Sequence, residues 1–208
     1  MKTENLQTIQ TKEVLLSNAL ETAMPYNAYR ELVTNHVESE TSTGPNQTDA
    51  LINYTKLNDA RMRRLDKTTK ISEAYQTLFS NYKKKVTWLV LTESWCGDAA
   101  QSLPILNKIA AIVPHLNLKV VLRDEHIDLM QYFLTNGAMA IPKLIAIDDA
   151  SRVVLGTWGP RPSVATQMAA NYKATHGTLT PKFKEELQGW YTKDKGLSIV
   201  ADIEGLLQ

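Results

Sequence analysis

The sequence predicts an α/β fold in which a mixed sheet is flanked by helices. The first observation is a continuous apolar run at residues 86–91, which is typical of a buried strand. The second is a turn at residues 95–99 that leads directly into an amphipathic stretch at residues 99–113. The third is the order strand, helix, strand, hairpin and helix along the rest of this region, which suits a single mixed sheet.

Apolar and β-branched runs define four strands of this sheet. We expect them at residues 86–92, 118–122, 143–147 and 152–158, with a hairpin connection at residues 148–151. Helices are expected at residues 98–113, 128–134 and 163–173. In the first of these helices, Pro104 is expected to cause a kink, and five apolar side chains point inward: Leu103, Leu106, Ile109, Ala110 and Val113.

Helical periodicity continues on both sides of this core. The expected helices cover residues 11–24, 26–37, 48–67 and 72–82 before the core, and residues 182–192 and 197–207 after it. Pro25 either ends the first helix or begins the second, and Asn46 or Thr48 caps the third. We therefore divide the chain into an N-terminal helical extension that packs on the core (residues 1–84), the core (85–175) and a C-terminal helical extension (176–208).

The third N-terminal helix carries two kinds of side chain that need an interpretation. Its expected buried positions are Leu51, Tyr54, Leu57, Met62 and Leu65. Its end is basic, with Arg61, Arg63, Arg64 and Lys67. Basic residues suit a helix C-terminus, so we interpret them as a solvated helix end rather than a patch that binds a partner.

Composition excludes several classes of protein. A chain of 208 residues with 43% hydrophobic and 22% charged residues is ordinary for a soluble protein. A net charge of +1 gives no support for nucleic-acid binding. No apolar run approaches the ~18 residues that span a bilayer, and the polar N-terminus lacks the apolar centre of a signal peptide. We expect a cytoplasmic protein with neither nucleic acid nor membrane as its partner.

The single cysteine, Cys96, lies where the first core strand turns into its helix. One cysteine excludes a disulfide framework. The helix N-terminus favours a thiolate, and flanking Gly97 and Asp98 suit a surface turn, so we expect an exposed thiol rather than a buried one. Asp98 stabilises the helix start but opposes a thiolate by like charge. The sequence leaves open which effect on Cys96 is larger.

Two motifs resemble the thioredoxin superfamily. The run Trp-Cys-Gly-Asp-Ala at residues 95–99 resembles its Trp-Cys-Gly-Pro-Cys active site, and residues 140–145 resemble its cis-proline element, with Ile141 before Pro142. The Asp after Gly, together with residues 122–125 and 135–137, resembles a bacterial branch with a helical N-terminal extension. The resemblance covers about residues 86–175 and implies a thioredoxin-like sheet, a cis Ile141–Pro142 bond and redox chemistry at Cys96.

The sequence departs from that family pattern at the second cysteine. Ala99 stands in its place, so no intramolecular disulfide forms and a resolving thiol has to come from outside. The resemblance then implies a monothiol thiol–disulfide oxidoreductase. Cys96 would form a mixed disulfide with a protein, a peptide or a small thiol, and glutathione or another low-molecular-weight thiol would resolve it. No other cofactor is expected.

A second departure is Val90, which stands where many thioredoxins carry a buried Asp that assists proton transfer. The nearest carboxylates, Glu93 and Asp98, are expected to be solvated rather than to move protons. His126 is a hypothetical base for Cys96, and the other histidines show no metal-ligand spacing, so no metal site is expected.

The site is expected to gather the residues around both motifs. Ile141 would pair through its main chain with an extended substrate. Arg161 would offset Asp98, bind an anion such as a glutathione carboxylate, or lie in solvent with its stem on Trp158. The catalytic residue is Cys96, supported by Trp95, Gly97, Asp98, Ala99, Ile141, Pro142, Trp158, Arg161 and Arg123.

Two further interpretations of the same residues stay open. The fold could serve as a non-catalytic binding module, which the large helical additions favour because they supply a partner surface. The thiol could instead act as a redox sensor through a sulfenic acid.

Overall fold

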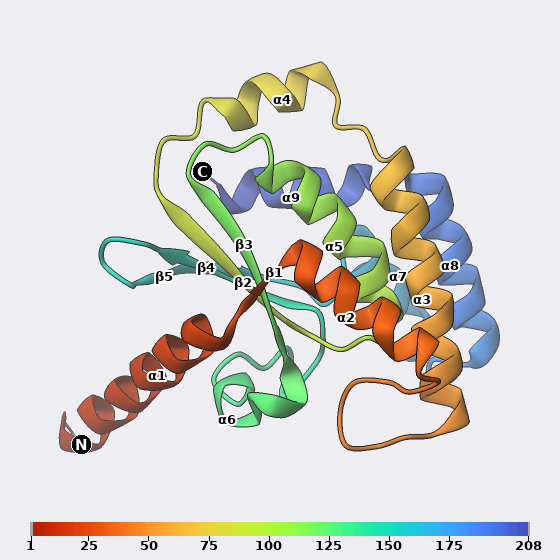
Figure 1. The fold of residues 1–208 in the computed structure, drawn as a ribbon, viewed down its shortest axis with the longest axis horizontal. Coiled ribbons are helices and arrows are strands. Elements are labelled where there is room, and N and C mark those ends of the chain that lie inside the picture. Colours follow the sequence, from red (N-terminus) through yellow and green to blue (C-terminus); the bar gives the residue numbers. More distant parts are fainter. Residues whose placement is uncertain (1, 208) are drawn as a thin grey trace.

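The structure, a computed structural model, describes residues 2–207, with side chains from residue 11 onward. Its centre is a mixed sheet with the strand order β1-β3-β2-β4-β5, and helices surround it (Figure 1). The strands are β1 (Met24–Pro25), β2 (Val86–Thr92), β3 (Leu116–Leu122), β4 (Lys143–Asp148) and β5 (Val154–Trp158). β2 runs parallel to β3 and antiparallel to β4, which pairs with β5 as a hairpin. The expected mixed sheet flanked by helices is confirmed.

The helices lie close to their expected positions. They are α1 (Lys2–Thr22), α2 (Tyr26–Glu38), α3 (Asp49–Thr68), α4 (Glu73–Ser80), α5 (Gly97–Ala110), α6 (Ile127–Met130), α7 (Ser163–His176), α8 (Pro181–Asp194) and α9 (Leu197–Leu206). α1 is longer than the sequence predicted and α6 shorter. α1 extends away from the sheet at the N-terminal end of the molecule (Figure 1).

The core forms around β2 and α5. All seven residues of β2 are buried, which fits its position in the middle of the sheet between β3 and β4. Leu103, Leu106 and Ile109 of α5 are fully buried, as expected, while Ala110 is only partly buried. Each such aliphatic side chain contributes roughly 1.5–3 kcal/mol relative to an exposed position. α5 packs against α3 and α9, which come from the two ends of the chain.

The two-residue strand β1 was not expected from the sequence. Met24 and Pro25 pair antiparallel with Val120 and Lys119 of β3. A strand this short gives no periodic signal, so only the position of β3 beside it identifies it. Pro25 is the N-cap residue of α2, directly before its first residue, whereas α1 already ends at Thr22; of the two alternatives, the start of the second helix is therefore the closer one.

The predicted buried face of α3 is wrong in part. Tyr54 and Leu57 are 46% and 51% exposed, whereas Thr55, Asn58 and Asp59 are buried. These polar side chains are buried because each has a partner on a neighbouring element. Hydrophobicity alone therefore predicted the wrong orientation for the first half of this helix.

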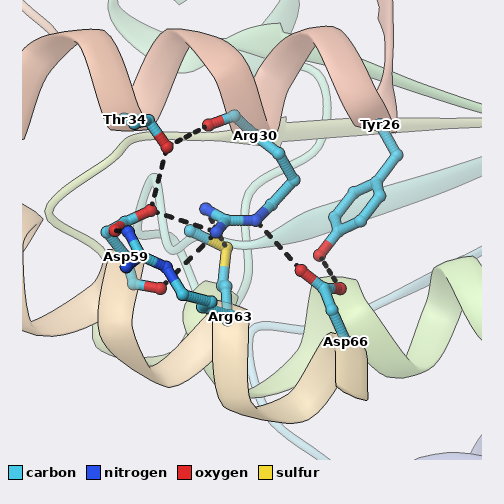
Figure 2. Close-up of polar contacts among 7 residues, drawn as sticks. Tyr26, Arg30, Thr34, Asp59, Arg63 and Asp66 are labelled. Atoms are coloured by element: carbon cyan, nitrogen blue, oxygen red, sulfur yellow. Dashed lines mark hydrogen bonds and ion pairs between the residues drawn. The ribbon is translucent and has the colours of Figure 1, made fainter.

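One set of these partners lies on α2. Figure 2 shows Arg30 of α2 between two carboxylates of α3, bonded to Asp59 at 3.0 Å and to Asp66 at 3.1 Å. The hydroxyl of Tyr26 donates to Asp66 at 2.7 Å, and Thr34 donates to Asp59 at 3.2 Å. All of the charges drawn in this cluster are paired. Arg63, expected in a solvated helix end, also pairs with Asp59.

Among residues 2–207, no helix has both the length and the apolar character needed to cross a membrane.

Candidate functional site

Cys96 is the N-cap residue of α5. β2 ends at Thr92, and the Cys96 N–H closes the following turn by donating to the Glu93 carbonyl at 3.1 Å. The Cys96 Sγ accepts a hydrogen bond from the Ala99 N–H at 3.4 Å, so the sulfur occupies the place that a cap oxygen usually takes. The expected position at a helix start is therefore confirmed.

The expected exposure of this thiol is wrong. Cys96 is only 8% exposed, and its S–H donates to the Ile141 carbonyl at 3.3 Å. The Ile141–Pro142 peptide bond beside it is cis, and both of its residues are buried. On the other side, α8 closes over the turn, since a methyl group on Gly97 would lie 3.4 Å from the Gln188 side chain. Tertiary packing therefore buries a thiol that the local sequence predicted to be exposed.

Burial has the largest effect on the ionisation of the Cys96 thiol, larger than the effects of the helix N-terminus and of Asp98, which oppose each other. It raises the pKa of the Cys96 thiol to about 12, and the nearby charge of Asp98 acts in the same direction. The Ala99 N–H and Arg161 act in the opposite direction and are outweighed. The thiol is therefore protonated near neutral pH.

The expectation that the two carboxylates near Cys96 are solvated is wrong as well, because Glu93 is fully buried and the Asp98 side chain is only 11% exposed. Asp98 pairs with Arg161 at 2.7 Å and accepts the Tyr191 hydroxyl at 3.1 Å. Glu93 has no exposed surface, and it accepts the Thr43 hydroxyl and the Asp124 N–H. Burial raises the pKa of both carboxyl groups.

Thr43 fixes the loop at residues 39–47 against the turn that carries the thiol. Its hydroxyl accepts the Ser94 N–H at 2.8 Å, and its own N–H donates to the Ser94 hydroxyl at 3.0 Å. Its carbonyl accepts the Trp95 indole N–H at 3.2 Å. From α3, Thr55 contacts the Ser94 hydroxyl, and Asn58 donates to the Ser94 carbonyl. Residues outside the core strands thus hold the turn in place.

A cavity of about 690 Å³ opens beside the sulfur. It brings together six of the expected supporting residues: Trp95, Gly97, Asp98, Arg123, Ile141 and Arg161. The Arg123 guanidinium lies 5.1 Å from the centre of the Trp95 ring.

The remaining expected residues do not line this cavity. Ala99 contributes its N–H from behind the sulfur, and Pro142 is buried at the start of β4. The Trp158 indole N–H donates to Asp202 of α9 at 3.0 Å. His126, the hypothetical base, lies 3.3 Å from the Thr22 hydroxyl of α1 and lines a different pocket. Its pairing with Cys96 was a wrong hypothesis.

Sequence reasoning predicted helices at the positions of α3 and α8 but not that these helices line the cavity. α3 supplies Leu51, Tyr54 and Arg61, and the segment around α8 supplies Leu179, Phe183, Lys184, Glu185, Leu187 and Gln188. Arg61 was expected in a solvated helix end. No local signal marks these residues, because they lie far from Cys96 in the sequence and meet it only through packing. In the described part of the chain, no cluster of His, Cys, Asp and Glu side chains could hold a metal ion.

The sheet, the cysteine at the start of α5 and the neighbouring Ile141–Pro142 bond define a thioredoxin-like protein. A family model described as Thioredoxin matches residues 44–173, which is more than half of the chain. The chain therefore belongs to the thioredoxin family. No match was found among curated proteins.

Two solved structures share this fold. A crystal structure of an HIV epitope-scaffold has a TM-score of 0.61 at 14% identity and covers 92% of this chain and 96% of its own. A protein of unknown function from Pseudomonas aeruginosa has a TM-score of 0.58 at 16% identity, with coverages of 92% and 95%. At these identities the likeness concerns the fold alone.

Proposed function

We propose that this thioredoxin-like protein binds a ligand in the cavity beside Cys96, and that it keeps the thiol protonated while the cavity is free. The observation that carries the proposal is the environment of the sulfur. It is buried, it donates to the Ile141 carbonyl, and it faces a cavity large enough for a ligand. Burial raises the pKa of this thiol to about 12, so the protonated form is favoured near neutral pH.

The lone cysteine supports a binding role. A dithiol cycle needs a resolving cysteine, and the position for it holds Ala99. Attack on a disulfide and oxidation by peroxide both need the thiolate, so a protonated resting thiol weakens the catalytic and sensor interpretations alike.

The pH dependence of Cys96 alkylation tests this proposal. Because the chain has one cysteine, the iodoacetamide adduct counted by intact mass reports on Cys96 alone. We expect the rate to keep rising above pH 9, with a midpoint far above the value of ~8.5 for free cysteine. The same protein unfolded in urea gives the matched control, with an ordinary midpoint. A folded-state midpoint at or below 8.5 would overturn the proposal.

A second candidate is monothiol exchange, which the Ala99 N–H bond to the sulfur favours because it stabilises a thiolate. The Cys96 thiolate would attack one sulfur of a disulfide in a protein, a peptide or a small molecule. This attack forms the mixed disulfide and releases the other half as a thiolate, which takes up the proton. A second external thiolate, from glutathione or a similar thiol, would then attack the mixed disulfide and free Cys96.

Incubation of the reduced protein with oxidised glutathione at pH 7 distinguishes the two candidates. The binding proposal predicts that the mixed disulfide on Cys96 forms more slowly than on the urea-unfolded protein. Monothiol catalysis predicts faster formation on the folded protein. The Cys96→Ser variant controls for non-covalent retention of glutathione.

Three further expectations from the sequence are also proposals. They are membership of a bacterial single-cysteine branch, a cytoplasmic location in which a free thiol persists, and the division of the chain at residues 84 and 175.

A further inference from the structure

The cavity beside Cys96 has an apolar lining that the free protein leaves partly uncovered: Phe183 and Leu187 are buried, whereas Tyr54 and Met139 are exposed. Leu51 and Tyr54 of α3 lie on one part of the lining, and Phe183 and Leu187 of α8 lie on another. Tyr54 is 46% exposed, and Met139, which also lines the cavity, is 39% exposed. A volume of about 690 Å³ falls in the range of small-molecule sites, which are mostly apolar with a few polar groups.

Most of the charges around this cavity are already compensated. Arg161 pairs with Asp98 at 2.7 Å, and Arg123 pairs with Asp124 at 2.6 Å. Lys184 and Glu185 are exposed and opposite in sign. These groups add no net charge to the site.

Arg61 is the exception. It is half-buried, and its guanidinium donates to the neutral Asn58 side chain at 2.9 Å. No carboxylate lies within ion-pair distance of it among residues 11–207. Burial lowers its pKa, which reflects the cost of keeping this charge out of water. The guanidinium faces the turn of the thiol, since a methyl group on Gly97 would lie 3.6 Å from its Nη1.

We propose that the cavity binds a small monocarboxylate with an apolar body, whose carboxylate pairs with Arg61 while its body covers the exposed side chains of Tyr54 and Met139. A guanidinium presents parallel N–H donors that match the two oxygens of a carboxylate. Asp98 also attracts Arg61 at longer range but pairs directly with Arg161, so these three side chains carry one net positive charge, which matches one negative charge on the ligand. The inference rests on the proposed function in that the same cavity is the binding site.

The geometry favours a small molecule over a peptide. An extended peptide would add to the fold by pairing with main-chain groups beside the sulfur. The Ile141 carbonyl there already accepts the Cys96 S–H. Residues of α3 and of the segment around α8 both line the cavity, and the two helices lie on the same side of the molecule in Figure 1.

Calorimetric titration with matched probes tests this inference. The probes are octanoate and 4-phenylbutyrate, and the controls are octanamide and 4-phenylbutyramide, which keep the body and remove the charge. We expect each carboxylate to bind about tenfold more tightly than its amide, as for a charged hydrogen bond. Arg61→Gln should remove this preference, so that each carboxylate binds no more tightly than its amide.

Two further variants make the result specific. Arg64→Gln removes the same charge from the same helix at an exposed position outside the cavity lining, and it should change carboxylate affinity less than twofold. Arg61→Lys keeps the charge but loses the paired donors, and it should retain part of the preference. Circular dichroism of each variant confirms that it is folded.

Several outcomes would overturn the inference. They are equal affinity for acids and amides, binding by none of the four probes, a preference that survives Arg61→Gln, or tighter binding of an acidic pentapeptide than of both carboxylates. The alkylation profile of Cys96, measured on the same preparation, reports separately on the proposed resting thiol. A high midpoint without carboxylate binding overturns this inference alone. A low midpoint with carboxylate binding overturns the proposed state of the thiol alone.

Discussion

The two sides of α3 differ in whether their charged side chains have partners. Toward α2, Asp59 and Asp66 enclose Arg30, and each charge of that cluster has a partner (Figure 2). Toward the cavity, Arg61 faces the thiol turn without a carboxylate partner. Paired buried charges fix how two helices pack. A half-buried charge without a carboxylate partner does not stabilise the packing of the free protein in this way. The comparison separates a structural cluster from a candidate binding group on one helix.

The largest effect is expected where the paired cluster is broken. Asp59→Ala leaves the Arg30 guanidinium, whose side chain is 14% exposed, without its nearer carboxylate. Breaking a buried ion pair in this way costs about 3–5 kcal/mol, which urea unfolding measures. Asp66→Ala is the matched control and should cost less, because the Asp66 side chain is 31% exposed. Equal losses for both variants would contradict a single buried pair at the centre of the cluster.

A smaller loss is expected between the loop at residues 39–47 and the turn that carries the thiol, where the contacts are neutral apart from Glu93. Thr43→Val removes the hydroxyl that donates to Glu93 and accepts the Ser94 N–H. Leaving these buried groups without partners costs about 1–3 kcal/mol of unfolding free energy. Thr43→Ser keeps the hydroxyl and should stay close to the wild type. Unchanged stability of Thr43→Val would mean that the loop at residues 39–47 does not brace the turn.

The pH dependence of the unfolding free energy tests whether burial of ionised Glu93 destabilises the folded protein. Burial raises its pKa in the folded state, so the folded protein binds a proton more tightly than the unfolded chain. Stability therefore falls as pH rises from the ordinary carboxyl value of ~4.3 through the raised pKa. Glu93→Gln removes this contribution, so its stability relative to wild type should improve as pH rises. Parallel stability profiles of wild type and Glu93→Gln from pH 4 to 8 would argue against a raised pKa of Glu93. Asp98 is present in both proteins, so its contribution cancels in the comparison.

The smallest effect is expected at Arg61. Arg61→Gln loses one hydrogen bond to Asn58 but also relieves a half-buried charge, so the unfolding free energy should change by less than ~1 kcal/mol. Arg63→Ala should lie in the same range, because Arg63 is 60% exposed although it pairs with Asp59. Both are measured by urea unfolding. A loss at Arg61 as large as that of Asp59→Ala would make Arg61 structural and remove the contrast between the two sides of α3.

The strongest sequence signals mark the elements whose structure depends mainly on neighbouring residues in the chain. β2 lies at the residues where the apolar run predicted it, and α3 begins after Thr48, one of the two expected caps. Cys96 caps α5 because a strand-to-helix turn places it there. β1 escaped prediction because a two-residue strand has no period.

The site was predicted less completely than the fold. Ile141, Trp95 and Asp98 were expected beside Cys96 and do line its cavity, because they belong to motifs whose arrangement follows the strands. Tyr54 and Arg61 were assigned to a core face and a solvated end. Periodicity could not correct this assignment, since polar side chains at Thr55 and Asn58 are buried by distant partners rather than by hydrophobicity.

The sequence by itself determined the strand, turn and helix that carry Cys96, and it determined that no second cysteine can resolve a disulfide within the chain. The tertiary structure alone decided the state of the thiol and the walls of the cavity. Its burial, its bond to Ile141 and the packing of α8 over Gly97 all join residues far apart in the chain. Such contacts depend on how helices from both ends of the chain fold back on the sheet, and no local sequence pattern specifies contacts between residues so far apart in the chain.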